Sequence, residues 1–153
     1  MAKPSVELVR TLRATALRLR EGARYEWGHY GACNCGHLAQ TLTNLTPGQL
    51  HRYAQQRGGE WRHQAEAWCD TSDQPFDLVM GQMVRAGLHV EDIAQLETLS
   101  DPTVLANLPG GPRWLSANSR DDAVLYLETW ATLLEQRLQP AAPTEHQRFV
   151  GRA

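Results

Sequence analysis

Apolar residues recur at helical spacing along most of the chain, and the alternating pattern of a half-buried strand is nearly absent. The N-terminal segment illustrates this pattern. Ser5 is a favourable helix N-cap and Gly22 a favourable stop. The pattern predicts an amphipathic helix over residues 5–22 that turns one apolar face toward a core. That face carries Leu8, Val9, Leu12, Ala16 and Leu19.

The same spacing, with matching cap signals, predicts further helices as far as residue 138. Asn34 is the expected N-cap of the second helix. Thr46 and Gln49 have the spacing of a capping box, and Ser119 and Asp122 repeat this spacing before the clearest apolar stripe. The expected helices after the first span about residues 34–45, 47–57, 61–69, 75–86, 90–99, 102–108 and 120–138.

The chain shows no sign of division into parts. No segment repeats with a fixed period, and no linker rich in Ser, Gly or Pro interrupts the helical patterns. A length of 153 residues fits one globular domain. We therefore predict an all-α fold of six to eight helices in a single compact domain over residues 1–139, in which the long first and last helices enclose the shorter ones. Residues 140–153 are expected to form a flexible tail.

The helical period fails over residues 23–34, where an aromatic loop is expected before the second helix. Tyr25, Trp27, His29 and Tyr30 lie there among glycines. The chain contains five Trp but only two Phe. Core packing explains most such residues. Because a buried Trp needs a partner for its indole N–H, some of these rings are also candidates for the wall of a pocket for a flat ligand.

Charge and composition narrow the classes of partner. Fifteen Lys and Arg against seventeen Asp and Glu give a net charge of -2, which argues against a nucleic-acid binder with a basic surface. The apolar runs are too short for a membrane span, and the N-terminus lacks the apolar core of a signal peptide. Three cysteines without an export signal favour reduced thiols. We expect a cytoplasmic protein that has a protein or a small molecule as its partner. We expect it to bind neither nucleic acid nor a membrane.

One cluster of cysteine and histidine suggests chemistry. Cys33 and Cys35 lie where the aromatic loop turns into a helix, and His29 precedes Cys33 by four residues. Thiolate and imidazole are preferred zinc ligands, and Cys69, near the expected end of another helix, would complete a closed set of three Cys and one His. We therefore predict a zinc site formed by Cys33, Cys35, Cys69 and His29 that fastens the loop to the helices and supports a binding or regulatory role.

The fourth ligand and the metal stay open. His37 follows Cys35 by two residues, and two helical residues turn the chain by about 200°, so in a regular helix His37 points away from that thiol. His51, on the third helix, is the reserve. Iron or copper would also suit a set of soft ligands.

A second hypothesis is a cysteine-dependent enzyme or a thiol redox sensor. A thiol at a helix N-terminus with a histidine in reach is the arrangement of an activated nucleophile, and Cys35 with His29 or His37 fits it. The segment Asn34-Cys35-Gly36-His37-Leu38 resembles the Asn-Cys-Glu-His-Phe box of the lecithin:retinol acyltransferase-like enzymes, whose Cys is a helix-borne nucleophile. That family carries its catalytic His on a strand. Because this sequence predicts no strand, the activity is not transferred.

A third hypothesis is a metal-free protein interaction module. The apolar stripe of the fifth expected helix includes Phe76, Met80 and Met83. An exposed patch of this kind would be a docking surface. The sequence does not decide how much of the stripe faces solvent, nor the oligomeric state.

Overall fold

The computed structural model describes residues 1–139, and within them the chain forms eight helices and no strand, in one compact domain. The prediction of an all-α fold with six to eight helices is confirmed. Residues 140–153, the expected tail, lie outside the described part of the chain. The helices are α1 (Val6–Arg20), α2 (Asn34–Thr43), α3 (Pro47–Arg57), α4 (Trp61–Glu66), α5 (Pro75–Arg85), α6 (Val90–Thr98), α7 (Pro102–Ala106) and α8 (Arg120–Leu138).

Several helices begin at the caps that the sequence predicts. The hydroxyl of Ser5 accepts a hydrogen bond of 3.0 Å from the first turn of α1, and that of Ser119 accepts one of 3.2 Å at the start of α8. Thr46 and Gln49 form the expected capping box, with hydrogen bonds of 2.9 and 3.2 Å in the two directions. These starts could be predicted because a cap is satisfied by residues within one turn of it.

The N-cap of α2 is Cys33 and not Asn34, so that prediction is wrong by one residue. The Sγ atom of Cys33 accepts a hydrogen bond of 3.4 Å from the backbone N–H of Gly36. Asn34 is instead the first helical residue, where its Oδ1 accepts a hydrogen bond of 2.8 Å from the backbone N–H of Cys35 and its side-chain amide donates to backbone oxygens of α6.

The fourth helix is shorter than expected, since α4 ends at Glu66 and not near Cys69. The indole N–H of Trp68 donates a hydrogen bond of 3.1 Å to the backbone oxygen of Asp77, in α5. This bond fixes the loop after α4 against α5, and it leaves Cys69 exposed in that loop.

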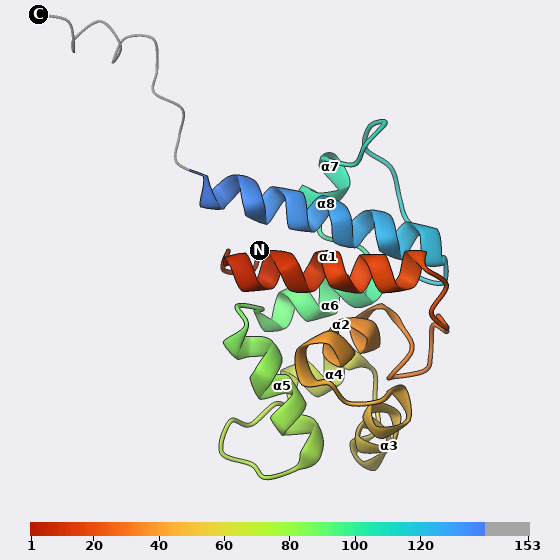
Figure 1. Cartoon of the computed structure of the whole chain (residues 1–153). Helices are drawn as coiled ribbons and strands as arrows, with labels where there is room; N and C mark the ends of the chain where they lie inside the picture. The colour runs from red at the N-terminus through yellow and green to blue at the C-terminus, as the bar shows by residue number, and fades with distance from the viewer. Residues whose placement is uncertain (140–153) are drawn as a thin grey trace, which may run out of the picture.

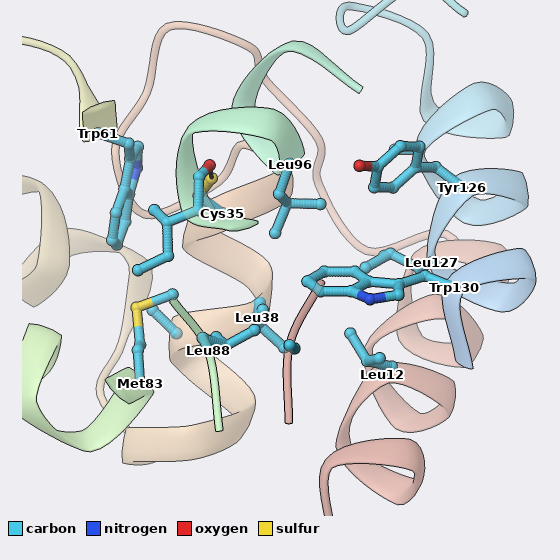
Figure 2. Packing of buried hydrophobic residues seen from close by; sticks show 14 of the residues in the cluster. Leu12, Cys35, Leu38, Trp61, Met83, Leu88, Leu96, Tyr126, Leu127 and Trp130 are labelled. Atoms are coloured by element: carbon cyan, nitrogen blue, oxygen red, sulfur yellow. Dashed lines mark hydrogen bonds between the residues drawn. The ribbon is translucent and has the colours of Figure 1, made fainter. Parts of the chain in front are cut away.

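The two long helices, α1 and α8, lie side by side and run antiparallel (Figure 1). Helices α2 to α6 lie on the other side of α1, and α7 lies against α8 (Figure 1). The expectation that the long helices enclose the shorter ones is therefore wrong. Apolar side chains from both helices meet in the interior instead. Leu12 of α1 and Trp130 of α8 are almost fully buried near each other (Figure 2).

A single apolar core joins all the layers. Leu38 of α2, Leu96 of α6 and Leu127 of α8 are fully buried in it (Figure 2). The stripe of α5 also faces this core, because Phe76, Met80 and Met83 are almost completely buried. These three residues of the stripe therefore do not form an exposed docking surface.

Among the described residues, no helix combines the length and the apolarity that a membrane crossing requires. This result agrees with the short apolar runs of the sequence.

Candidate functional site

The three cysteines lie in different environments. Cys33 and Cys35 are buried, whereas Cys69 is exposed. Burial raises the pKa of the Cys33 thiol to about 11, and burial likewise raises the pKa of the Cys35 thiol. The hydroxyl of Thr71, whose Oγ1 lies 3.3 Å from the Cys69 sulfur, lowers the pKa of that exposed thiol. The two buried thiols are therefore protonated near neutral pH.

The Cys35 side chain points into the core beside Leu96 (Figure 2). Its Sγ atom lies 3.5 Å from the backbone oxygen of Ile93, in α6, to which the thiol donates. His37 does not face it. The Nε2 atom of His37 lies 2.7 Å from the backbone oxygen of Arg24, and the guanidinium of Arg18 contacts Nδ1 of the same ring at 3.4 Å. This environment is that of a packed thiol and a structural histidine, not of a nucleophile with its base.

His29 and His51 are paired with each other. Their rings stack with centroids 4.0 Å apart and an angle of 13° between the planes. The Nδ1 atom of His29 accepts from the N–H of Gly31 at 3.1 Å, and that of His51 accepts from the N–H of Tyr30 at 3.1 Å. Because Nδ1 uses its lone pair in this way, the neutral ring carries its proton on Nε2, so neither nitrogen offers a lone pair to a metal in this arrangement.

The predicted zinc ligands are thus only partly brought together. His29 and Cys33 line the same hollow, Cys35 faces the core, and Cys69 lies in the exposed loop after α4. No group of three or more Cys, His, Asp or Glu side chains suited to a metal occurs within residues 1–139. The zinc site, with iron or copper as the other metals, stays a prediction from the sequence.

The hollow that contains His29 and Cys33 is the most developed candidate site. Its volume is about 170 Å³, and we call it the aromatic hollow. The aromatic loop forms one wall, and the starts of α2 and α4 and the end of α6 form the others. This confirms that the loop borders a pocket. The lining residues are Trp27, Gly28, His29, Tyr30, Cys33, Glu60, Trp61 and Glu97.

The wall made by the loop is held by close contacts with α2 and α4. The indole N–H of Trp61 donates a hydrogen bond of 3.2 Å to the backbone oxygen of Tyr30, and the Tyr30 hydroxyl donates to the backbone oxygen of Gly59. Gly36 makes the approach of α2 possible, because a Cβ atom at that position would lie 2.3 Å from the backbone oxygen of Tyr30. The hollow is therefore formed by the fold before any ligand binds.

The end of α6 is anchored to the same wall. The side-chain amide of Asn34 donates to the backbone oxygens of Leu96 at 2.8 Å and of Glu97 at 3.1 Å. The indole N–H of Trp27 also donates to the Glu97 oxygen, at 3.4 Å. Carbonyls in the last turn of a helix have no partner within the helix. Asn34 and Trp27 supply those partners and so fix where the Glu97 side chain lies.

The Glu97 carboxylate is the most unusual group in the aromatic hollow. The residue is only 8% exposed, and its Oε2 atom accepts a hydrogen bond of 2.9 Å from the backbone N–H of Arg62. No side-chain cation forms an ion pair with it among residues 1–139. Burial raises the pKa of the Glu97 carboxyl and the neighbouring Glu60 raises it further, whereas the Arg62 N–H and the nearby His63 imidazole lower it. Its anion is therefore destabilised in the free protein.

The pKa of the Tyr30 phenol, which also lines the hollow, is affected by the same negative potential. Burial raises the pKa of Tyr30, and the carboxylates of Glu97 and Glu60 raise it further. A nearby negative charge disfavours a second anion and favours a cation. The aromatic hollow is therefore electronegative.

Sequence reasoning missed Glu60 and Glu97 as site residues. For Glu97 a signal was present, since it follows Ile93 by four residues and therefore lies on the buried face of α6. A carboxylate at an apolar-face position is a candidate for a special role. Glu60 gave no comparable signal, because its place depends on how α4 packs on α6.

Comparison with known proteins identified no similar protein. No family model, no curated protein and no solved structure matches this chain. The functional conclusion therefore depends on the side chains of the hollow and their chemistry.

Proposed function

We propose that this protein is a binding module for a small organic cation, an alkylammonium group, which it takes into the aromatic hollow. The observation that carries the proposal is Glu97, a residue that is more than nine-tenths buried and whose carboxylate lacks an ion-pair partner within the described chain. A buried carboxylate without a counter-charge is costly. A ligand cation at this position would supply the missing charge.

The rest of the lining suits the same ligand. Trp27, Tyr30 and Trp61 present aromatic surface around the hollow, and an ammonium group is attracted to the face of such rings. The methylene groups next to the ammonium would pack against the same rings. Trp27 is 51% exposed, so it stands at the rim, where an arriving ligand can cover it.

The charge of the ligand follows from the charges that face the hollow. Among residues 1–139, Glu60 and Glu97 line it, and no Lys or Arg does. An anionic ligand would be repelled by both carboxylates. A neutral flat ligand would satisfy the aromatic rings but would leave the Glu97 carboxylate uncompensated. An organic cation satisfies both features.

The direct test is a calorimetric titration at pH 7 and low ionic strength with hexylamine, and with hexanol as the uncharged analogue. We expect hexylamine to bind and hexanol to bind at least about tenfold more weakly, because charge-assisted contacts supply most of the affinity. The variant Glu97→Gln keeps an oxygen to accept the Arg62 N–H and removes the charge. It should weaken hexylamine binding about 10- to 100-fold.

The matched control is Asp73→Asn, which removes a carboxylate that is exposed in the loop before α5 and lines no part of the hollow. Hexylamine should bind this variant as it binds the wild type, within about twofold. Equal binding of hexylamine and hexanol would contradict the proposal, as would equal losses in the Glu97→Gln and Asp73→Asn variants.

A further inference from the structure

A second hollow shares two residues with the aromatic hollow. It is a surface groove of about 300 Å³ along α6, and we call it the α6 groove. Glu60 and Glu97 line both hollows. The two spaces are therefore adjacent at this pair of carboxylates. The other residues that line the α6 groove are Arg62, Glu91, Ala94, Gln95, Thr98 and Ser100.

The lining of the α6 groove differs in character from that of the aromatic hollow. Within residues 1–139 no aromatic ring lines it, and its amide, hydroxyl and carboxylate groups accept hydrogen bonds. Glu91, Ala94 and Thr98 follow one another at spacings of three and four, so they occupy one face of α6. The α6 groove is therefore suited to a polar part of a ligand, and the aromatic hollow to an apolar and cationic part.

The charges of the α6 groove are predominantly negative. Glu60, Glu91 and Glu97 face it, and Arg62 is the one basic side chain that lines it in the described part of the chain. The Nε atom of Arg62 lies 3.5 Å from the carboxylate of Glu66, one turn further along α4. Glu91 is exposed, and within the described residues its side chain has no ion-pair partner.

We propose that the aromatic hollow and the α6 groove together form one site for a linear aliphatic diamine or polyamine. This inference rests on the proposed binding of an alkylammonium group at Glu97. The first ammonium lies in the aromatic hollow at Glu97, the methylene chain passes Glu60, and a second ammonium lies in the α6 groove at Glu91. The geometry of the helix sets the separation. Glu97 follows Glu91 by six positions of α6, a rise of about 9 Å along the helix axis.

The second contact is weaker than the first. Glu91 is exposed, and an exposed ion pair gives roughly a 1.4-fold to fivefold gain in affinity. A symmetric diamine also gains about twofold because either end can enter the aromatic hollow. The diamine should therefore bind about three- to tenfold more tightly than the monoamine at low ionic strength, and the difference should shrink as salt screens Glu91.

The experiment compares hexylamine with hexamethylenediamine, which differ only in the second ammonium, by calorimetry on the wild type and on Glu91→Gln. We expect the wild type to favour the diamine by about three- to tenfold. In Glu91→Gln the preference should fall to about twofold, because the variant weakens the binding of the diamine more than that of hexylamine. Asp73→Asn serves as the control for loss of one distant negative charge and should keep the full preference.

The outcomes separate the two proposals. If hexylamine fails to bind the wild type, the proposed function itself is contradicted. If hexylamine binding depends on Glu97, but the affinity for the diamine is no more than about twofold higher, only the proposal that the two hollows form one site, the joint site, is overturned. The joint site is also overturned if Glu91→Gln and Asp73→Asn reduce the preference equally, because a long-range effect of net charge would then explain it.

Discussion

The side-chain amide of Asn34 donates a hydrogen bond of 2.8 Å to the backbone oxygen of Leu96, and so joins the first turn of α2 to the last turn of α6. Asn34 is fully buried, and the same amide also donates to the next carbonyl of α6. The Leu96 oxygen also accepts from the backbone N–H of Leu99 at 3.2 Å, and the Glu97 oxygen accepts from the indole N–H of Trp27, so the Asn34 amide reinforces two helix-end carbonyls. The bond also fixes the turn that carries Glu97.

The variant Asn34→Asp tests this contact with almost no change of shape. At pH 7 the new carboxylate would face carbonyl oxygens with no proton to donate, and we expect a loss of about 3 kcal/mol in the free energy of unfolding. The loss should shrink at low pH, where a protonated Asp can donate once. Urea denaturation at both pH values measures it. Asn118→Asp, at an exposed site, should stay within about 0.5 kcal/mol of the wild type; equal losses at both sites would count against the contact.

Gly36→Ala probes the close approach of α2 to the aromatic loop. The added Cβ would lie 2.3 Å from the backbone oxygen of Tyr30, so the loop must move, and we expect a loss of about 2–3 kcal/mol in stability. Gly48→Ala is the matched control in α3, because nothing lies within 4 Å of its added Cβ. It should be neutral or stabilise by about 0.5–1 kcal/mol. Similar thermal melting of the two variants would refute this account of Gly36.

Thiol labelling distinguishes the environments of the cysteines. In the native protein one thiol, that of Cys69, should react rapidly with a coloured disulfide reagent near neutral pH, because it is exposed and its pKa is lowered. Cys33 and Cys35 should react only on unfolding, since burial raises the pKa of each thiol. Cys69→Ser should leave no fast-reacting thiol. Rapid native labelling of that variant would revive the hypothesis of a thiol enzyme.

The stability of the free protein should depend on pH through Glu97. Burial raises the pKa of this carboxyl above its ordinary value of 4.5, so the folded chain holds the proton more tightly than the unfolded chain. The contribution of Glu97 is therefore present at low pH and is lost as pH rises through the interval above 4.5. Relative to wild type, Glu97→Gln should be equally stable well below that interval.

At pH 7 the same variant should be about 1 kcal/mol more stable than the wild type, because it no longer buries an unpaired charge. Denaturant midpoints measured across the pH range give the difference, and Asp73→Asn controls for net charge. A Glu97→Gln variant that is less stable at pH 7 would show that the carboxylate has a favourable partner. A residue that weakens the free protein and strengthens ligand binding is typical of a functional position.

The sites show where sequence reasoning succeeded and where it failed. It identified the aromatic loop, because Tyr25, Trp27 and Tyr30 interrupt the helical period between two strong helices. It also placed Cys33 and Cys35 correctly at the start of α2, but it could not tell that one lines a hollow and the other faces the core. That difference depends on where α6 lies, and nothing near residue 35 encodes it.

The sequence by itself determined the helical class, the extent of most helices, the caps at Ser5, Thr46 and Ser119, and the aromatic loop. Each depends on residues within a few positions of one another, so local spacing and hydrogen bonding are enough to predict it. Only the tertiary structure decided that α1 and α8 pack together and that Glu97 is buried beside Trp27 and Glu60. These relationships join residues far apart in the sequence, and they arise from packing between helices, which no local pattern specifies.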